Sequence, residues 1–468
     1  MSLGAAGGNA KLESITNFLY RGAPLGTQSA AILLGDTKFY GTLAAVRSLG
    51  RAGVKVVTVD PSWICHSRYS RYSSQHLRCP AFEESNAWAE WLLRKARIGP
   101  RRAIYATSDA VSFALARYRI ELSADFELYQ PGLETVMSIL DKGLLMQNAQ
   151  AIGIETPPTW FPENGAEAKK IAKDAGEAIL VKPRSQLAQR TKTKGTVVET
   201  RGHRVRSIFD DYVKDQSINS EFAKQSSLAM TPLIQQYYPQ AIDNVYSLSG
   251  FREKIGGGVI MRAARKILQH PRHIGIGLCF EPAVVDPLLA DQAKRLCERI
   301  GYYGAFELEF ILAEGRAMLI DFNGRFYQIA FDIARGMELP ALAYAAATKN
   351  QAEVSRLMAL GGSGNHSDVA GFCNHFVLTT MVKMQRIFRT MSRKDAALWL
   401  SWSRGSHGTI VDAVRDPHDA LPAFVEVAQR LLDVVRHPRA FVRQYGLEQV
   451  RADAKTLFSD DVADELSY

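Results

Sequence analysis

Acidic side chains are concentrated in one otherwise apolar stretch of the sequence, residues 306–328. This stretch reads FELEFILAEGRAMLIDFNGRFYQ and contains four carboxylates, an asparagine and two arginines around a short turn. Carboxylate and amide oxygens are the ligands that Mg²⁺ and other hard cations prefer. The stretch is therefore a candidate cation site, and the alternative is a solvated acidic face on an antiparallel sheet.

Alternating apolar and polar residues predict a β-hairpin that gathers these oxygens on one face. Successive residues of a strand point to opposite faces of the sheet. Glu307 and Glu309 would therefore lie on one face of the first strand, and Phe306, Leu308 and Phe310 on the other. In the second strand, one face would carry Leu319, Asp321, Asn323 and Arg325.

The length of the turn decides which side chains meet across the hairpin. A three-residue loop over 314–316 would set Glu309 opposite Asp321 and Glu307 opposite Asn323, whereas a two-residue loop would set an isoleucine against Glu309. Directly opposed side chains have Cβ atoms about 4.5–5.5 Å apart, so two carboxylates there repel each other. A divalent cation would turn this repulsion into attraction, and Mg²⁺ combines one or two carboxylates with substrate phosphates.

Two lysines lie on elements that precede the hairpin. A helix is predicted over 142–151, with Lys142 as its first residue. Gly153 and the prolines at 157 and 158 cannot continue a helix, so they set its end. A strand over 178–182 ends at Lys182, where a charge after an apolar run needs a partner. A helix over 166–175 and a strand over 233–238 are also predicted. Lysines on two different elements can neutralise a polyphosphate.

The N-terminal part of the chain predicts a βαβ unit and hence a parallel sheet. Residues 30–34 and 54–59 read as buried strands around a helix with apolar positions 43, 46 and 49. Residues 103–106 predict another strand, and 108–118 a helix that Ser108 can cap. Gly35 and Gly41 do not form the G-x-G-x-x-G pattern, which argues against binding of NAD.

The order and separation of these features resemble the ATP-grasp superfamily, of the carboxylate–amine ligase type found in carbamoyl-phosphate synthase and biotin carboxylase. The resemblance covers about residues 30–348. It rests on DK before a helix ending in G-I-x-x-P, on V-K-P after a strand, and on the hinge run LIQQYY. It also rests on RKILQHP at 265–271 and on the hairpin motif E-F…D-F-N-G-R.

The resemblance implies a role for each matching residue. Lys142 and Lys182 would contact phosphates, four hinge residues would hold adenine through main-chain groups, and Lys266 would reach the reacting carboxylate. Three hairpin residues would bind Mg²⁺, with Mn²⁺ as an alternative, and Arg325 would contact a phosphate or acyl phosphate. The hinge residues are Gln235, Gln236, Tyr237 and Tyr238, and the metal ligands are Glu309, Asp321 and Asn323. Two alternatives stay open: Arg262 or Arg265 in place of Lys266, and Glu307 as a further ligand.

The sequence departs from the family pattern at several positions. Asp321 stands where glutamate is usual, Gln235 replaces the common hinge glutamate, and Gly324 replaces a proline. The glycine-rich lid that many members have over the phosphates is represented by PRSQLAQRTKTKG, residues 183–195. Here a lid would rely on side chains, and the alternative is an exposed loop. The basic residues in question are Arg190, Lys192 and Lys194, beside Gly195.

The predicted fold class is α/β and α+β. The expected domains are a Rossmann-like pre-ATP-grasp domain with a parallel sheet (27–138) and a two-subdomain ATP-grasp domain with antiparallel sheets (139–358). A mostly helical C-terminal extension (367–468) would follow a linker over 359–368. A helix over 421–435 is the clearest element of that extension.

Composition narrows the class of protein. A hydrophobic content of 47% and a charged content of 22% are typical of a globular protein. Five scattered cysteines without a C-x-x-C pair predict reduced thiols and a cytoplasmic location. No uninterrupted apolar stretch is long enough to span a membrane, and the N-terminal residues do not have the pattern of a secretory signal. The net charge of +9 is spread along the chain, so we expect no nucleic-acid partner.

The expected activity is ATP-dependent ligation. ATP would phosphorylate a substrate carboxylate to an acyl phosphate, which an amine (or a thiol) attacks with release of ADP and phosphate. The expected partners are small-molecule carboxylates and amines, and a homodimer is left open. A non-catalytic or regulatory ATP-binding protein and an NAD-dependent dehydrogenase are the alternatives. No biotinyl M-K-M segment occurs in the chain, although biotin could come from a separate protein.

Overall fold

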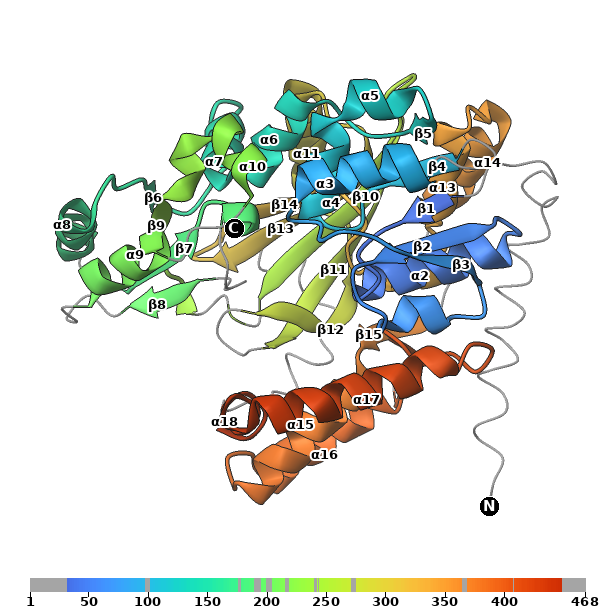
Figure 1. Ribbon diagram of the computed structural model, residues 1–468. Helices are drawn as coiled ribbons and strands as arrows, with labels where there is room; N and C mark the ends of the chain where they lie inside the picture. The colour runs from blue at the N-terminus through green and yellow to red at the C-terminus, as the bar shows by residue number, and fades with distance from the viewer. Residues whose placement is uncertain are drawn as a thin grey trace, which may run out of the picture.

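Three sheets with their helices make up the part of the chain that the computed structural model describes. The described residues are 32–96, 102–175, 178–188, 195–198, 204–214, 219–239, 242, 244–270, 275–363, 368–406 and 408–447. Figure 1 shows a seven-stranded sheet between a five-stranded sheet at the right and a four-stranded sheet at the left. The predicted mixture of α/β and α+β architecture is confirmed.

The five-stranded sheet is parallel throughout, with strand order β3-β2-β1-β4-β5. Every residue of β2, VVTVD, is buried, as expected where helices cover both faces of a parallel sheet. The predicted βαβ unit is therefore confirmed. The strands are β1 (Ile32–Leu34), β2 (Val56–Asp60), β3 (Ser73–Arg78), β4 (Arg102–Tyr105) and β5 (Phe126–Leu128).

Both helices predicted in this region are present, and α4 begins just after its predicted cap. Helix α2 (Tyr40–Arg51) joins β1 to β2, and α4 (Asp109–Arg117) follows β4. Ser108 caps α4, because its hydroxyl oxygen accepts a hydrogen bond from the N–H of Val111. The shorter elements of this region are η1 (His66–Tyr69), α3 (Ser85–Trp91), η2 (Leu92–Ala96), α5 (Arg119–Ser123) and α6 (Leu133–Leu140).

The four-stranded sheet is antiparallel, with strand order β6-β9-β7-β8. Helices α8 (Gly165–Ala175) and α9 (Val205–Lys214) pack on it through a small core of their own. Its strands are β6 (Thr159–Trp160), β7 (Ile179–Pro183), β8 (Thr196–Val198) and β9 (Pro232–Gln236). Other elements around it are α7 (Lys142–Gln150), η3 (Gln186–Ala188), α10 (Ser220–Gln225) and η4 (Ser227–Met230).

The seven-stranded sheet has the order β14-β13-β10-β11-β12-β15-β16. Its first six strands are antiparallel neighbours, and only β15 and β16 pair in parallel. The strands are β10 (Val245–Arg252), β11 (Val259–His270), β12 (Ile276–Ala283), β13 (Gly304–Ala313), β14 (Arg316–Asn323), β15 (Val369–Cys373) and β16 (Thr409–Asp412). The helices between them include α11 (Pro287–Ile300), α12 (Ala330–Ala334), α13 (Leu339–Ala347) and α14 (Gln351–Gly362).

The C-terminal part is mostly helical, as predicted, but its two strands complete the central sheet. Helices α15 (His375–Ile387), α16 (Arg393–Ser403) and α17 (Leu421–Arg436) form the layer at the bottom of Figure 1, followed by α18 (Pro438–Phe441) and η6 (Val442–Leu447). The prediction of a linker is wrong over 359–362, because α14 continues to Gly362. Residues 364–367 of the predicted linker lie outside the described residues.

One hydrophobic core connects the parallel sheet to the central sheet. It includes Ile104 of β4, Phe113 of α4, Val136 of α6 and Leu296 of α11, together with Phe306 of β13. Because these elements share a core, loops of the parallel sheet and strands β13 and β14 are held in fixed positions relative to each other.

All five cysteines are buried free thiols, as predicted. Among the described residues, none of the helices combines the length and the apolar character that a bilayer crossing requires.

Candidate nucleotide and metal site

The hairpin of β13 and β14 has the predicted register at its acidic residues. Glu309 lies opposite Asp321, and Glu307 lies opposite Asn323. These four side chains come from neighbouring strands at one edge of the seven-stranded sheet. The prediction that the hairpin gathers its oxygens in two opposed rows is confirmed.

The predicted three-residue turn is wrong. Ala313 pairs with Arg316, so the turn consists of Glu314 and Gly315 alone. Both residues have left-handed backbone angles, with φ of 57° and 70°, which is the geometry of a type I′ hairpin turn. A glycine at the second position favours this turn because it has no Cβ.

A β-bulge at Ile320 reconciles the short turn with the register of the acids. Phe310 pairs with Leu319, whereas the preceding residue Glu309 pairs with Asp321, so Ile320 is the extra residue. Leu319 consequently lies in the main core rather than on the face of Asp321, contrary to prediction. Ile320 lines the cavity in its place.

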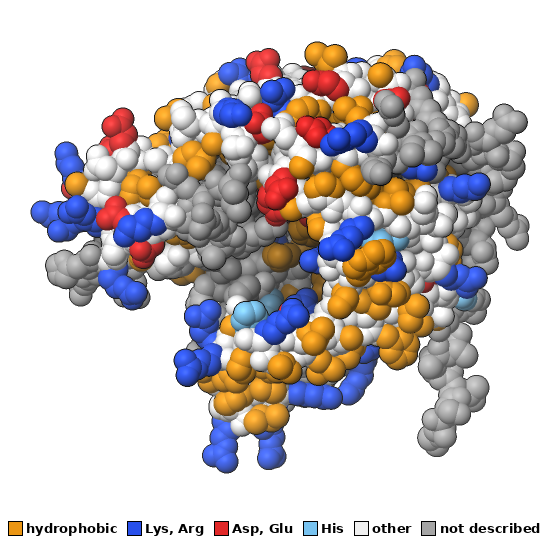
Figure 2. Space-filling view, in the orientation of Figure 1, with side chains coloured by type: hydrophobic (Ala, Val, Ile, Leu, Met, Phe, Trp, Pro, Cys, Tyr) orange, Lys and Arg blue, Asp and Glu red, His pale blue; other side chains and the backbone are white. Residues whose placement is uncertain are grey.

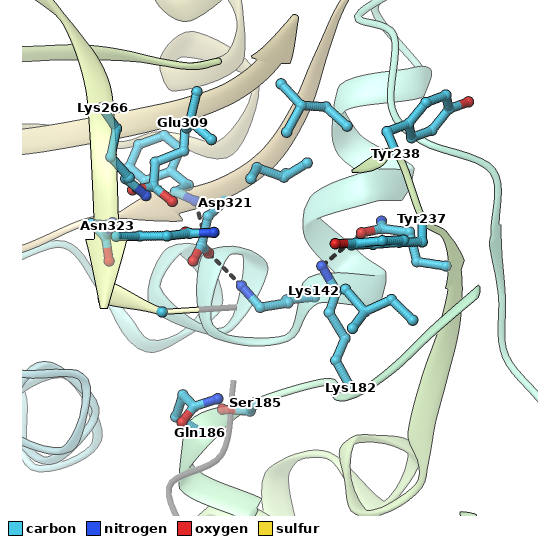
Figure 3. Close-up of a pocket in the computed structure, with 18 of the residues that line it drawn as sticks. Lys142, Lys182, Ser185, Gln186, Tyr237, Tyr238, Lys266, Glu309, Asp321 and Asn323 are labelled. Atoms are coloured by element: carbon cyan, nitrogen blue, oxygen red, sulfur yellow. Dashed lines mark hydrogen bonds and ion pairs between the residues drawn. The ribbon is translucent and has the colours of Figure 1, made fainter. Parts of the chain in front are cut away.

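In the first row, which consists of Glu309 and Asp321, each carboxylate has a lysine as its partner. Lys142 at the start of α7 forms an ion pair with Asp321, and Lys266 of β11 donates from Nζ to Glu309 Oε1 at 2.8 Å. Figure 3 shows Lys142 pointing to Asp321, and Lys266 beside Glu309. The repulsion that the opposed carboxylates would exert is therefore balanced by two ammonium groups.

The second row pairs buried Glu307 with half-buried Asn323 through a hydrogen bond. Asn323 Nδ2 donates to Glu307 Oε2 at 3.0 Å, and the Ser247 hydroxyl donates to the other oxygen. Burial, reinforced by the nearby charge of Glu309, raises the pKa of Glu307 to about 7. Burial acts against the ammonium form of Lys266, but Glu309 and Glu307 outweigh it and raise the pKa of Lys266.

The raised pKa of Glu307 predicts a pH dependence of stability. A carboxyl group whose pKa is higher in the folded protein stabilises the fold fully below its unfolded pKa, about 4.5, and this contribution disappears as pH rises through about 7. In nucleotide-free protein, the melting temperature of wild type relative to Glu307→Gln should therefore fall between pH 5 and pH 8. A difference that is constant with pH, or that grows, would contradict this assignment.

Lys182 and Gln235 are held together on neighbouring strands. Lys182 of β7 is buried, and its Nζ donates to Gln235 Oε1 at 2.8 Å. Gln235 Nε2 in turn donates to the hydroxyl of Thr159 at 2.9 Å. The expected partner of the strand-terminal lysine is therefore the amide oxygen of the hinge glutamine. The lysine thus pairs with a neutral amide rather than with a carboxylate.

The start of α7 is positioned by a buried ion pair. Asp141 caps the helix by accepting from the N–H of Gly143, and Arg184 donates to both of its carboxylate oxygens, from Nε at 3.0 Å and from Nη2 at 3.2 Å. The N–H of Lys142 donates to the carbonyl of Arg184 at 2.9 Å. These contacts fix the backbone of Lys142 against the end of β7.

The hinge run ends as a strand earlier than predicted. Strand β9 stops at Gln236, so Tyr237 and Tyr238 lie beyond it. The N–H groups of Gln236 and Tyr237 donate to the carbonyls of Pro158 (2.9 Å) and Ala178 (3.1 Å). The N–H groups of Gln236 and Tyr237 are therefore already used within the protein.

Arg325 follows the end of β14 and contacts the parallel-sheet region. Its Nε forms an ion pair with Asp109 Oδ1 at 2.5 Å, and its Nη2 donates to Asn323 Oδ1 at 3.0 Å. Burial disfavours the guanidinium charge, but Asp109 outweighs this and raises the pKa of Arg325. Asp109 was not among the predicted site residues; its position at the first turn of a helix after a parallel strand is the signal that could have identified it.

Ten of the eleven predicted site residues line one cavity of about 170 Å³, and Arg325 is the exception. Lys266 lines it, whereas Arg262 and Arg265 do not; Arg265 instead pairs with Glu281 at 2.9 Å. Residues that sequence reasoning missed also line the cavity, and Figure 3 shows two of them, Ser185 and Gln186, below the lysines. Asp109 and Gln269 are two further polar residues that line the cavity and were not predicted. The predicted lid residues Arg190, Lys192 and Lys194 lie outside the described residues.

The residues of the hairpin fit a cation that arrives with phosphates. Among the described residues, no three carboxylate, imidazole or thiol side chains converge as a ready-made metal site. Glu309 and Asp321 are nevertheless two opposed carboxylates whose present partners are ammonium groups. Phosphate oxygens could take over Lys142 and leave Asp321 to a metal, which matches the way that Mg²⁺ is shared between carboxylates and substrate phosphates.

Comparisons of sequence identify no relative: no family model matches the chain, and no curated protein matches it either. Comparison of structures finds chains with a similar fold. A biotin carboxylase from Campylobacter jejuni, in a complex with β,γ-ATP, aligns with a TM-score of 0.52 at 16% identity, covering 68% of this chain and 71% of that one. The biotin carboxylase domain of the Hydrogenobacter thermophilus 2-oxoglutarate carboxylase, a dimer with MgADP, ADP and bicarbonate, aligns at 0.51 and 14%, covering 72% and 71%. These alignments show a shared fold, and at 14–16% identity they show the fold alone.

Proposed function

We propose that this chain, which has the ATP-grasp fold of these biotin carboxylases, is an ATP-dependent ligase. In the proposed reaction, ATP phosphorylates the carboxylate of a small substrate to an acyl phosphate. An amine then attacks the acyl carbon, which gives an amide and releases phosphate and ADP. A thiol nucleophile would give a thioester by the same route.

The observation that supports this proposal is the composition of one cavity between two sheets. Lys142 and Lys182 reach it from the side of the four-stranded sheet, and Glu309 and Asp321 reach it from the central sheet. Cations facing carboxylates across a cavity are what Mg²⁺ and a polyphosphate together require, because each can exchange its present partner for one of opposite charge.

In the proposed first step, the protein contributes charge and position. Lys142 would leave Asp321 for a phosphate oxygen, and Lys182 would neutralise another. Glu309, Asp321 and Asn323 would hold Mg²⁺ (Mn²⁺ as an alternative), which lowers the repulsion between the phosphates and the incoming carboxylate. The carboxylate oxygen bonds to the γ-phosphorus as the bond to the ADP oxygen breaks.

In the proposed second step, buried Lys266 and half-buried Arg325 would stabilise the acyl phosphate. Lys266 is kept protonated by the acids around it, so it can bind the reacting carboxylate or the transferred phosphoryl group. Arg325 does not itself line the cavity, but Asp109 and Asn323, which do, hold it beside the cavity, and from there it would contact the same group as a planar donor. The amine forms the new C–N bond, loses a proton, and displaces inorganic phosphate.

The direct test is a phosphate-release screen with Mg·ATP over paired amino acids and small carboxylates. Bicarbonate with free biotin belongs in the same screen, since turnover only with that pair would assign a carboxylase. Release that requires both a carboxylate and an amine supports the proposal. ATP binding without substrate-dependent ADP formation would instead indicate a non-catalytic ATP-binding protein. A thermal shift with NADH and none with Mg·ATP would indicate a dehydrogenase.

Asp109→Asn tests the assigned position of Arg325. The substitution keeps the shape of the side chain but removes the charge that orients the guanidinium, and a misplaced contact group commonly costs about tenfold to a hundredfold in rate. We expect kcat to fall in that range with little change in the KM for ATP. The longer carboxylate of Asp109→Glu should restore part of kcat; an Asp109→Asn enzyme with wild-type kcat would contradict the role.

A further inference from the structure

A second cavity lies between the parallel sheet and helix α17. Its volume is about 410 Å³, and it shares no lining residue with the nucleotide cavity. Three segments surround it: the start of α2, the loop and η1 after β2, and one side of α17. A space of this volume can hold a small molecule. Its lining residues include Lys38, Tyr40, Ile64, His66, Arg430 and Arg436.

The wall of this cavity is a rigid polar network. Tyr40 donates from its hydroxyl to Glu426 Oε1 at 2.5 Å, and Asn374 Nδ2 donates to the same oxygen at 2.7 Å. Arg430 Nη2 donates to the Tyr40 hydroxyl at 3.0 Å. The ring of His66 stacks on that of Tyr40 with centroids 5.4 Å apart. These groups are therefore held in place without a ligand.

His66 presents a neutral ring to the cavity. It is only 2% exposed, and burial lowers its pKa to about 4, so the imidazole carries no charge at neutral pH. A neutral imidazole can donate or accept one hydrogen bond. A ligand could thus find a polar contact on this wall in addition to charge.

The charges that line the cavity are predominantly positive. Lys38, Arg430 and Arg436 contribute three cations, against the carboxylates of Glu426 and Asp433. Glu426 is 4% exposed, and its Oε1 already accepts from Tyr40 and Asn374, so its charge is directed into the wall. Figure 2 shows the same imbalance more widely: the lower half of this face, where α15, α16 and α17 lie, carries blue side chains and few red ones.

The first turn of α2 adds to this preference for anions. Lys38 and Tyr40, which flank its first N–H groups, both line the cavity. The N-cap residue Phe39 offers no side-chain hydrogen bond, so the helix end is not neutralised from within. The partial positive charge of a helix N-terminus favours a nearby anionic group.

From these observations we propose that the second cavity is a binding site for a small organic anion, whose carboxylate or phosphate group lies among Lys38, Arg430 and Arg436. Its carbon skeleton would rest against Ile64 and Leu432, the apolar side chains of the lining. The cations supply most of the affinity, and the polar wall supplies orientation. The site is separate from the nucleotide cavity, so it does not depend on the ligase activity proposed above.

Isothermal titration calorimetry on the 468-residue chain tests the site. The probes are glutarate and its neutral counterpart glutaramide, and glycerol 1-phosphate and its neutral counterpart glycerol. A saturating non-hydrolysable ATP analogue is present throughout to occupy the nucleotide cavity. We expect at least one anion to bind, neither neutral compound to bind, and the double variant Lys38→Gln/Arg436→Gln to weaken binding at least tenfold. The preferred anion reveals whether carboxylates or phosphates are the natural group.

The matched control is Lys394→Gln/Arg439→Gln, which removes the same net charge from exposed positions outside the cavity. This control should bind as wild type does. All four side chains are exposed, so melting temperatures without ligand should stay within a degree or two of wild type. Equal weakening in both double variants, equal binding of a neutral compound, or no binding of either anion would overturn the proposal.

Discussion

Asp321→Asn is expected to lower substrate-dependent phosphate release by about a hundredfold to a thousandfold, the range found when one electrostatic contact to a reacting group is removed. The amide keeps the size of the side chain and its place opposite Glu309. It removes one of the two charges that would hold the metal, and it also releases Lys142 from its ion pair. We therefore expect the loss mainly in kcat. The affinity for Mg²⁺ should also fall, so that half-maximal turnover needs a higher Mg²⁺ concentration.

Glu314→Gln is the matched control for this experiment. Glu314 lies in the turn of the same hairpin, exposed and paired with Arg316 at 2.6 Å, away from the cavity. Its neutralisation should leave kcat and the KM for ATP unchanged. Steady-state phosphate release at several Mg²⁺ concentrations measures both variants. Full turnover by Asp321→Asn would refute the metal assignment, and a comparable loss in Glu314→Gln would show a general charge effect.

Lys266→Met is expected to have the second large effect, and it should act on both stability and activity. The side chain of Lys266 is 4% exposed and that of its partner Glu309 is 17% exposed. Removing one member of a buried ion pair leaves the other charge uncompensated, at a cost of roughly 3–5 kcal/mol in the free energy of unfolding. Removal of the cation proposed to contact the reacting carboxylate should also lower kcat by about a hundredfold or more.

A double variant separates the two effects. In Lys266→Met/Glu309→Gln the uncompensated carboxylate is gone, so most of the lost stability should return, while activity should stay low. Lys294→Met, an exposed position on α11, is the control for loss of a lysine. Denaturant unfolding and phosphate release measure the two properties. Recovery of activity together with stability would show that Lys266 is structural, and failure to recover stability would show that its pairing with Glu309 is not what matters.

Most secondary-structure elements near the site could be predicted because their signals are local. The apolar run before Lys182, the prolines after the helix that begins at Lys142, and the cap at Ser108 each act over a few residues. The alternation over 306–311 likewise predicts a strand with both glutamates on one face. These patterns depend on neighbouring residues, so the sequence contains them in full.

The hairpin shows where local reasoning stops. The correct pairing of Glu309 with Asp321 was inferred from a turn one residue longer than the real one. The bulge at Ile320 compensates, since it lets Leu319 enter the core while Asp321 stays on the cavity face. Turn and bulge are set together by packing on both faces of the sheet, and alternation alone cannot specify that balance.

The sequence by itself determined which side chains would form the candidate site: two lysines, the hinge, and the acidic hairpin, in their order along the chain. The tertiary structure decided their partners. Arg325 pairs with Asp109, which is 216 residues away. Lys266 lines the cavity and its neighbouring arginines do not. Segments near both ends of the described chain together form the second cavity. Such contacts depend on how distant elements pack, and packing depends on the shape of the whole core rather than on any local pattern.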